Sequence, residues 1–169
     1  MCGGVEAREA DKVWKIYFPN PKAAIPVLFE DSSQLEWIHW GRRQDEPGTG
    51  PEGGWARFHT VQAGGWRKYR PRRGFGMVQR FMEKEGKPGE KNRPSHWFDV
   101  QEGCALECLV IGEGDERRVY VVTTDPPAEY AWIHARWPLV TPLDVEFRRQ
   151  GPLEDDLIGD SVRPADRAR

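Results

Sequence analysis

Short apolar runs separated by glycine and proline dominate the pattern of this chain, and they predict strands rather than long helices. In the run Leu35–Trp40, successive residues alternate between the two faces that a strand presents. Further strands are predicted at Val13–Phe18, Ile25–Phe29, Trp55–Val61 and Met77–Glu83, the last of which could also be a short helix. Later in the chain, a β-meander is predicted from Trp97–Gln101, Ala105–Ile111 and Arg118–Thr123.

The segments between these runs are predicted to be loops where glycine, proline and charged residues gather, at Asp45–Gly54, Gly64–Gly76 and Glu85–Pro94. Two short helices are expected nearer the C-terminus. One follows two consecutive prolines and covers Ala128–Ile133. The other begins at Thr141, which resembles a capping box with Asp144, and continues to about Gln150.

These elements predict an α+β fold with a mainly antiparallel sheet, or a distorted β-barrel, and a few short helices. A length of 169 residues is enough for one domain with one core, and we assign that domain to residues 1–150. Residues 151–169 carry terminal charges and are expected to form a loosely ordered C-terminal extension.

The composition predicts a globular, cytoplasmic protein. Hydrophobic residues make up 38% and charged residues 31%, and no stretch approaches the roughly 20 apolar residues of a membrane-spanning helix. The first residues lack the apolar segment of a secretory signal. Three cysteines leave at least one free thiol, which fits a reducing compartment. We expect a monomer with no membrane partner, associated with the nucleoid when bound to DNA.

Charge is distributed unevenly, although the net charge is only −2. No acidic residue occurs between Arg57 and Met82, while acids gather near the C-terminus, as at Glu154. The same acid-free stretch holds seven cations: Arg57, Arg67, Lys68, Arg70, Arg72, Arg73 and Arg80. This asymmetry indicates one face able to follow the phosphates of a nucleic acid.

Cys2 is the first candidate for chemistry. If Met1 is removed, Cys2 carries an α-amine and a thiol on adjacent carbons, with ordinary pKa values of roughly 7.7–8.0 and about 8.5. A fraction of each group is then nucleophilic at neutral pH. Such an aminothiol condenses with an aldehyde, first to an imine and then to a five-membered thiazolidine ring. Gly3 and Gly4 would allow a substrate to approach the backbone closely.

The other two cysteines, Cys104 and Cys108, are interpreted as buried core thiols. They share a face of one predicted strand but lie too far apart along it to form a metal site, and no second Cys/His pair has zinc-finger spacing. We therefore expect neither a metal nor an organic cofactor.

Six segments, in order, resemble the SRAP family, the SOS-response-associated peptidases that shield abasic sites in single-stranded DNA. The resemblance covers about residues 1–150, and the first and last segments are the most specific. The segments are Met1-Cys2-Gly3, Ile38-His39-Trp40-Gly41, Trp55-Ala56-Arg57-Phe58-His59-Thr60, Phe81-Met82-Glu83-Lys84-Glu85, His96-Trp97-Phe98-Asp99-Val100-Gln101-Glu102-Gly103 and Ile133-His134-Ala135-Arg136-Trp137-Pro138. Trp55 replaces the family's substrate-binding Asn, and the segment around Glu83 lacks the family's Trp.

The resemblance implies that Cys2 forms a covalent thiazolidine crosslink to an abasic site in single-stranded DNA, with associated autopeptidase and lyase-type chemistry in the DNA damage (SOS) response. His134 would protonate the sugar oxygen and pass protons during imine formation. Glu83 would act as general base or proton shuttle near the α-amine, with Asp99 as a rival carboxylate. Arg57 and Arg136 would hold phosphates beside the lesion, because a guanidinium matches two phosphate oxygens at once.

Other side chains are candidates for DNA contacts. We expect Trp40, Trp55 and Trp66 to stack on unpaired bases, although most of the eight tryptophans should be structural. Arg67 and Arg70 lie in a run that mixes aromatic and basic residues, as a groove for a single strand would.

Two other functions fit the same sequence. One is a non-catalytic module that binds single-stranded nucleic acid, in which Cys2 is inert. The other is a glutamine amidotransferase with an N-terminal nucleophile, in which Cys2 attacks the glutamine amide. That class needs an Asn-Gly oxyanion segment, and the two asparagines here, Asn20 and Asn92, are not followed by glycine.

Overall fold

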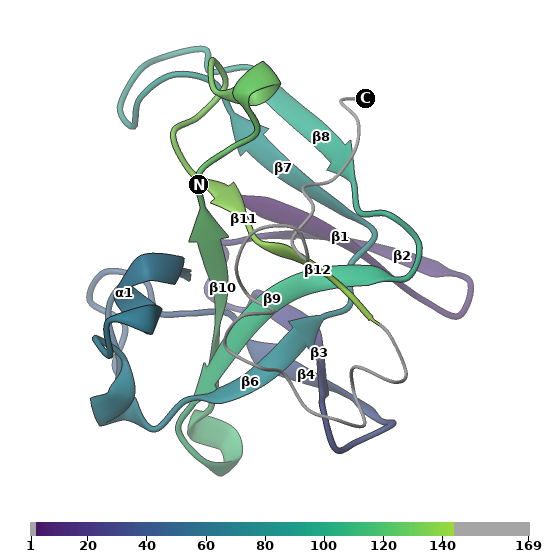
Figure 1. Cartoon of the computed structure of the whole chain (residues 1–169), viewed down its shortest axis with the longest axis vertical. Coiled ribbons are helices and arrows are strands. Elements are labelled where there is room, and N and C mark those ends of the chain that lie inside the picture. Colours follow the sequence, from purple (N-terminus) through teal and green to yellow (C-terminus); the bar gives the residue numbers. More distant parts are fainter. Residues whose placement is uncertain (1–2, 144–169) are drawn as a thin grey trace.

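A computed structural model of the chain describes residues 3–143, and these residues form two sheets (Figure 1). The smaller sheet has the strand order β2-β1-β7-β8, and all its neighbours are antiparallel. Its strands are β1 (Gly4–Glu9), β2 (Lys12–Tyr17), β7 (Arg80–Lys84) and β8 (Ser95–Asp99). The first strand of the chain is therefore an inner strand of this sheet.

The larger sheet has the main order β11-β10-β9-β6-β3-β4, with β12 paired to β9 and β5 paired to β10. The β5–β10 pair is parallel, while the other pairs are antiparallel. Its strands are β3 (Ala24–Phe29), β4 (Leu35–His39), β5 (Trp55–Arg57), β6 (Arg72–Gly76), β9 (Cys104–Ile111), β10 (Arg118–Thr124), β11 (Trp137–Pro138) and β12 (Val140–Pro142).

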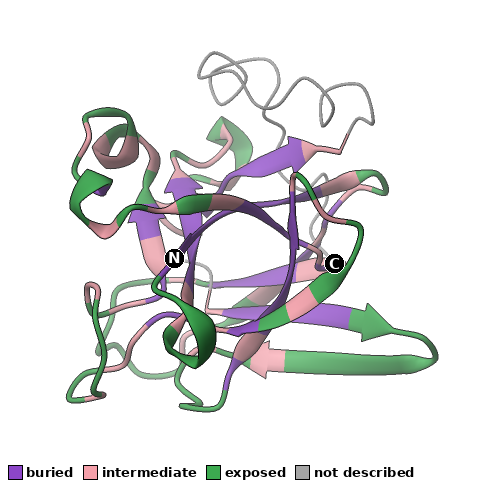
Figure 2. Ribbon diagram, turned by 90° about the horizontal axis from the view of Figure 1, so that it is seen from below, coloured by how far each residue is buried: buried purple, intermediate pink, exposed green. Residues whose placement is uncertain are grey.

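The two sheets share one core. Val5 and Phe81 of the smaller sheet belong to the same buried cluster as Val27, Val121 and Trp137 of the larger one. Burial of these apolar faces removes them from water and is the main force that holds the sheets together. Figure 2 shows the buried residues along the inner strands, while the β1–β2 hairpin projects outward with β2 largely exposed.

Helices in residues 3–143 are few and short. The α-helix α1 (Phe58–Gln62) contacts β5 and β10, and 3-10 turns occur at Arg67–Tyr69, Gly114–Glu116 and Ala128–Tyr130. A second buried cluster includes Trp66, Tyr120 and Leu139, and residues of α1 and of the first of these turns pack against it. No helix in this part of the chain is long and apolar enough to cross a membrane.

The predicted mainly β architecture with few helices is confirmed, and most predicted strands are present within a few residues. The strand expected at Trp55–Val61 ends at Arg57 and continues as α1. The loop expected at Gly64–Gly76 contains β6, whose glycines hid its strand pattern. Gly74 permits close strand packing, since a Cβ there would lie 2.6 Å from Cγ1 of Val27.

Three further expectations need correction. Strand β8 does not belong to a meander with β9 and β10, because it pairs with β7 in the other sheet. Strand β1 was not predicted, since Glu6 interrupts its short apolar run; that carboxylate is buried beside Arg80, 3.6 Å away. Thr141 does not cap a helix but lies in β12, and the rest of that predicted helix, like the 151–169 extension, falls outside the described residues.

Candidate functional site

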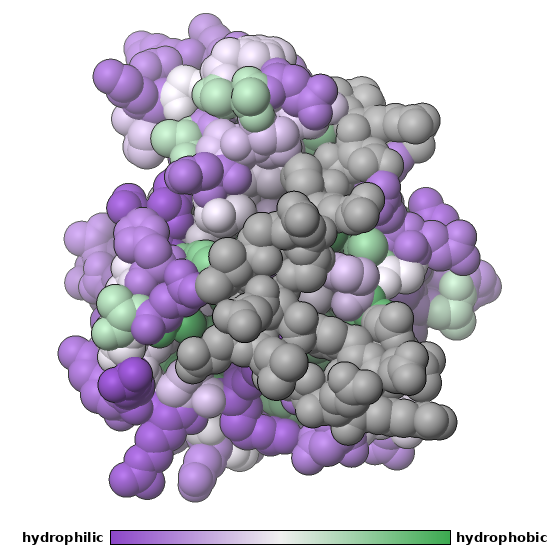
Figure 3. Space-filling model, viewed as in Figure 1, coloured by the Kyte–Doolittle hydropathy of each residue, from purple (hydrophilic) through white to green (hydrophobic). Residues whose placement is uncertain are grey.

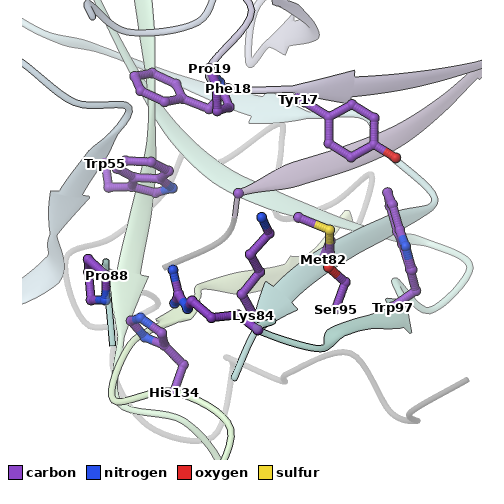
Figure 4. Close-up of a pocket in the computed structure, with 12 residues that line it drawn as sticks. Tyr17, Phe18, Pro19, Trp55, Met82, Lys84, Pro88, Ser95, Trp97 and His134 are labelled. Atoms are coloured by element: carbon purple, nitrogen blue, oxygen red, sulfur yellow. The ribbon is translucent and has the colours of Figure 1, made fainter. Parts of the chain in front are cut away.

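A cavity of about 580 Å³ opens at the end of the smaller sheet where the chain begins (Figure 4). Aromatic and basic side chains dominate its wall, and none of the described residues that line it is a carboxylate. The lining residues are Gly3, Tyr17, Phe18, Pro19, Trp55, Met82, Lys84, Pro88, Arg93, Ser95, Trp97 and His134. Lys84 extends into the middle of this space in Figure 4. A cavity of this size and character suits an unpaired base or sugar with its phosphates.

One row of residues across the smaller sheet forms an aromatic wall of the cavity. Gly4 pairs with Tyr17 on one side and Met82 on the other, and Met82 pairs with Trp97. The rings of Tyr17 and Trp97 meet edge to face with centroids 6.2 Å apart. Tyr17 packs directly over Gly4, because a Cβ there would lie 3.1 Å from its ring.

Gly3, the first described residue, is held firmly at this cavity. Its N–H donates to the carbonyl oxygen of Met82 at 3.0 Å, and its own carbonyl accepts the N–H of Phe18 at 3.1 Å. Cys2 lies outside the described residues. Because consecutive Cα atoms are about 3.8 Å apart, Cys2 nevertheless begins within that distance of a residue that lines the cavity.

His134 reaches the same cavity from the segment that follows the 3-10 turn Ala128–Tyr130. Its Nδ1 accepts the backbone N–H of Arg136 at 3.1 Å, so the neutral ring carries its proton on Nε2. Burial, aided by positive charges that include Arg93, lowers the pKa of His134 to about 4. At neutral pH the imidazole is therefore uncharged. It carries a single proton, on Nε2, and can donate one hydrogen bond from that atom.

Glu83 lies between two cavity-lining residues of β7, Met82 and Lys84, and so its side chain points to the opposite face of the strand. It is fully buried. Burial raises the pKa of Glu83 to about 8, an effect that nearby positive charge, including that of Arg93, reduces only in part. The carboxyl is therefore mainly protonated at pH 7, the form in which it can donate a proton.

Asp99, the rival carboxylate, lies on the other face of the sheet from Glu83. It is opposite Arg80 in the strand register, and its Oδ1 lies 3.6 Å from Nε of Arg80. Arg80 also lies 3.6 Å from Glu6 and above the ring of Trp97. Asp99 thus belongs to a row of paired charges beside the cavity. Glu83 and His134 instead share a neighbour, because the positive charge of Arg93 lowers the pKa of both.

Arg57 and Arg136, the two predicted phosphate-binding residues, lie close together. Arg57 is opposite Thr123 in the β5–β10 pair, and Nη2 of Arg136 donates to Oγ1 of the same threonine at 2.7 Å. Burial and then the charge of Arg57 lower the pKa of Arg136, with Asp125 opposing them. Two guanidinium groups close enough to repel each other would gain from an anion between them.

The tryptophans expected to contact DNA separate into two groups. Trp55 is half-buried and lines the cavity, on the same face of β5 as Arg57. Trp40 is fully buried, and its indole N–H donates to the carbonyl of Gly54 at 3.0 Å. Trp66 is buried against Tyr69 and Tyr120. The predictions for Trp40 and Trp66 are therefore wrong, because both rings are core residues.

Arg67 and Arg70 lie at the 3-10 turn Arg67–Tyr69 and do not line the cavity. Arg73, from the same basic stretch, forms a bidentate ion pair with buried Glu107 at 2.6 and 2.7 Å. The acid-free stretch therefore does not form one continuous surface, and part of it neutralises a core carboxylate.

Five aromatic or basic residues of the cavity wall were not predicted as site residues: Tyr17, Phe18, Lys84, Arg93 and Trp97. The pairing of β2, β1, β7 and β8 brings three of them together, and no local pattern reveals that pairing. Their aromatic and basic character was the only available signal.

Cys104 and Cys108 lie on β9 and contact the core, with Cys108 fully buried and Cys104 partly so. Among the residues that the structure describes, no group of His, Cys, Asp and Glu side chains has the arrangement of a metal site.

The fold and the site together define a mainly β protein with an aromatic, basic cavity at the start of its first strand. No protein-family model matches the sequence, and no curated protein matches it. The architecture does occur among solved structures.

The solved structures that resemble the chain include two proteins of bacterial or phage-related origin. A phage-related protein from Bordetella bronchiseptica has a TM-score of 0.62 and 14% identity, over 90% of each chain. A protein from Bacteroides thetaiotaomicron has a TM-score of 0.58 and 14% identity, and the match covers 81% of the present chain. The chain spans 65% of the length of the Bacteroides protein. Likeness at this level of identity shows the fold alone.

Proposed function

We propose that this chain binds single-stranded DNA and forms a covalent crosslink from Cys2 to the aldehyde of an abasic site. The observation that carries the proposal is the anchoring of Gly3 by two backbone hydrogen bonds at the wall of an aromatic, basic cavity. The residue before Gly3 starts at that wall, so an α-amine and a thiol there would meet whatever occupies the cavity.

The reaction is a condensation that needs no cofactor. After removal of Met1, the α-amine of Cys2 adds to the aldehyde carbon of the ring-opened sugar, and loss of one water gives an imine. The thiol then adds to the imine carbon, and its proton goes to the nitrogen. The product is a thiazolidine that joins protein and DNA.

His134 and Glu83 would handle the protons of these steps. With its proton on Nε2, the imidazole can donate a hydrogen bond to the sugar oxygen as the ring opens. Glu83, protonated near neutrality, would exchange protons with the α-amine of Cys2 rather than with groups in the cavity, because its side chain lies on the face of β7 opposite Met82 and Lys84. Both groups would be uncharged near neutral pH. The free protein therefore does not have to bury a charged imidazole or carboxylate before the DNA binds.

The DNA strand would be held by charge and stacking. Arg57 and Arg136 would bind a phosphate between them, Lys84 and Arg93 would contact the sugar-phosphate chain, and Trp55 would stack on a neighbouring base. With the ordered motifs of the sequence, these features support membership of the SRAP family and a role in the DNA damage response. The barrel closure expected of that family belongs to the same proposal.

A denaturing gel tests the reaction. Protein shown by intact mass spectrometry to lack Met1 is incubated with a labelled oligonucleotide that contains one abasic site. We expect a heat-stable shifted band, and we expect Cys2→Ala to abolish it. A Cys108→Ala variant removes a thiol of the core and should still crosslink. A band of equal intensity with Cys2→Ala would sink the proposal.

A non-catalytic module for single-stranded nucleic acid is the second candidate, favoured by a cavity wall that could bind a strand without Cys2. In that case the parent and Cys2→Ala would bind the abasic oligonucleotide equally, and neither would give the shifted band. Release of ammonia from glutamine by the parent, but not by Cys2→Ala, would instead support the amidotransferase alternative.

A further inference from the structure

A second groove lies beside the candidate site, between the edge strands of the two sheets. It has a volume of about 480 Å³ and runs between β2 and the residues around β3 and β4. Its wall includes Trp14, Lys15, Tyr17, Lys22 and Trp37. Strands β2 and β4 are each the last in their sheet, so the groove separates two open sheet edges.

The aromatic side chains of this groove are exposed rather than packed into the core. Trp14 and Trp37 remain 44% and 38% exposed and meet edge to face, with centroids 6.2 Å apart. Leu35, on the same face of β4 as Trp37, is exposed as well. Large apolar groups gathered in this way on the surface mark an interaction site more often than isolated exposed residues do.

Lysines accompany these rings. Nζ of Lys12 lies 5.8 Å from the centre of the Trp14 ring, and Nζ of Lys15 lies 5.4 Å from that of Trp97. Lys22 also lines the groove, where Glu9 is the only carboxylate among the described residues. Exposed rings combined with cations on flexible stems complement a partner that has both flat aromatic faces and negative charge, which is the chemistry of unpaired nucleic acid.

The groove is continuous with the candidate site. Tyr17 lines both spaces, and its ring meets Trp97, which lines the first. Figure 4 shows Tyr17 and Trp97 side by side at the edge of the cavity. A strand that leaves the cavity past these two rings would therefore enter the groove that Trp14 and Trp37 line.

We propose that the groove between β2 and β4 is an extended subsite that holds the single strand beyond the lesion by stacking its bases on Trp14 and Trp37. This proposal rests on the proposed function, since it takes the same DNA strand as the occupant of both spaces. The groove would contribute affinity without taking part in the reaction.

The test uses fluorescein-labelled oligodeoxythymidylates of about 20 nucleotides, with and without one abasic site, and a short abasic oligonucleotide of about 4 nucleotides. We expect Trp14→Ala and Trp37→Ala each to weaken binding of the long, intact strand at least about fivefold, the factor that corresponds to about 1 kcal/mol. Trp14→Phe keeps a ring and should recover most of the loss. Trp132→Ala is the matched control, because Trp132 is 63% exposed but lines neither space.

The two proposals fail in different ways. If Trp14→Ala and Trp37→Ala each bind the long strand like the parent, while the parent crosslinks the short oligonucleotide, the groove proposal is overturned and the reaction stands. If the parent never crosslinks but both tryptophan variants lose affinity, the groove stands and the reaction fails. The groove proposal would also be overturned if Trp14→Ala or Trp37→Ala changed the oligomeric state seen in sedimentation but kept the DNA affinity of the parent. The groove would then be a contact between copies of the chain.

Discussion

At the scale of single residues, the candidate site holds two groups whose pKa values are displaced from those of free side chains. A free histidine is partly charged near pH 6.5 and a free carboxyl is ionised at about pH 7. Here burial keeps the His134 imidazole neutral and leaves Glu83 mainly protonated. A pair of groups displaced in opposite directions is typical of sites that move protons.

His134→Ala should slow crosslinking at least about tenfold, a modest part of what a positioned proton donor supplies. Affinity for an intact single strand should change little, because the imidazole is uncharged at neutral pH and binds no phosphate. The measurement is the single-turnover rate of band formation, beside a separate binding titration. His59→Ala is the control, since His59 lies on α1 and lines no part of the cavity. Equal rates for the two variants would remove His134 from the mechanism.

At the scale of elements, the strands β5, β10 and β11 decide how the cations are used. Arg57 and Arg136 come from segments far apart in the sequence, and only their pairing with β10 places both beside Thr123. The repulsion between them makes this pair a better phosphate site than either cation alone.

Arg57→Ala should weaken binding of single-stranded DNA and reduce the slope of log affinity against log salt by about one unit. The slope is obtained from fluorescence titrations at several salt concentrations. Arg67→Ala provides the comparison, because Arg67 is exposed in the same basic stretch but belongs to the 3-10 turn and not to the Arg57–Arg136 pair. An unchanged slope for Arg57→Ala, with a lower slope for Arg67→Ala, would place the phosphates on the 3-10 turn instead.

The positions of most strands follow from the sequence, but their pairing does not. Alternating or continuous apolar residues were enough to locate β2, β3, β4, β9 and β10, because each strand has its own apolar pattern. Strand pairing could not be predicted, since the partner of β8 depends on contacts made elsewhere along the chain. The same limit applied to the tryptophans: Trp40 and Trp55 are each followed by a small residue and an arginine, but only Trp55 lines the cavity.

At the scale of the whole molecule, buried titratable groups tie folding to pH. The unfolded chain loses the Glu83 proton near pH 4.5, whereas the folded chain keeps it until about pH 8. Between these two pH values only the folded chain holds the proton. Stability from this group therefore falls as the pH rises through that window. The lowered pKa of His134 has the opposite sign, so its contribution rises with pH between about 4 and 6.5. Above pH 6.5, of these two groups, only Glu83 still changes the stability.

Glu83→Gln should consequently flatten the pH dependence of stability between about pH 6.5 and 8, where the parent loses on the order of 2 kcal/mol from this group. Urea unfolding at several pH values measures it. Asp99→Asn serves as the control, because Asp99 is partly exposed and paired with Arg80. Parallel curves for the parent and Glu83→Gln would mean that Glu83 is ionised in the folded protein.

The surface of the molecule is uneven in hydropathy. The face in Figure 3 is mostly hydrophilic among the described residues, with small apolar patches between charged ones. The exposed rings of β2 and β4 differ from the hydrophilic character of this face, which fits the extended subsite proposed above.

The position of Gly3 has a practical consequence for anyone who prepares this protein. Strand β1 is an inner strand, and Gly3 is bonded into the sheet at the cavity wall, so any residues placed ahead of it must start at that wall. Under the proposed function, an affinity tag or fusion partner at this end would compete with the DNA for the same space. Samples for functional assays should therefore carry their tag at the other end, and an inactive N-terminally tagged preparation would say nothing about the native protein.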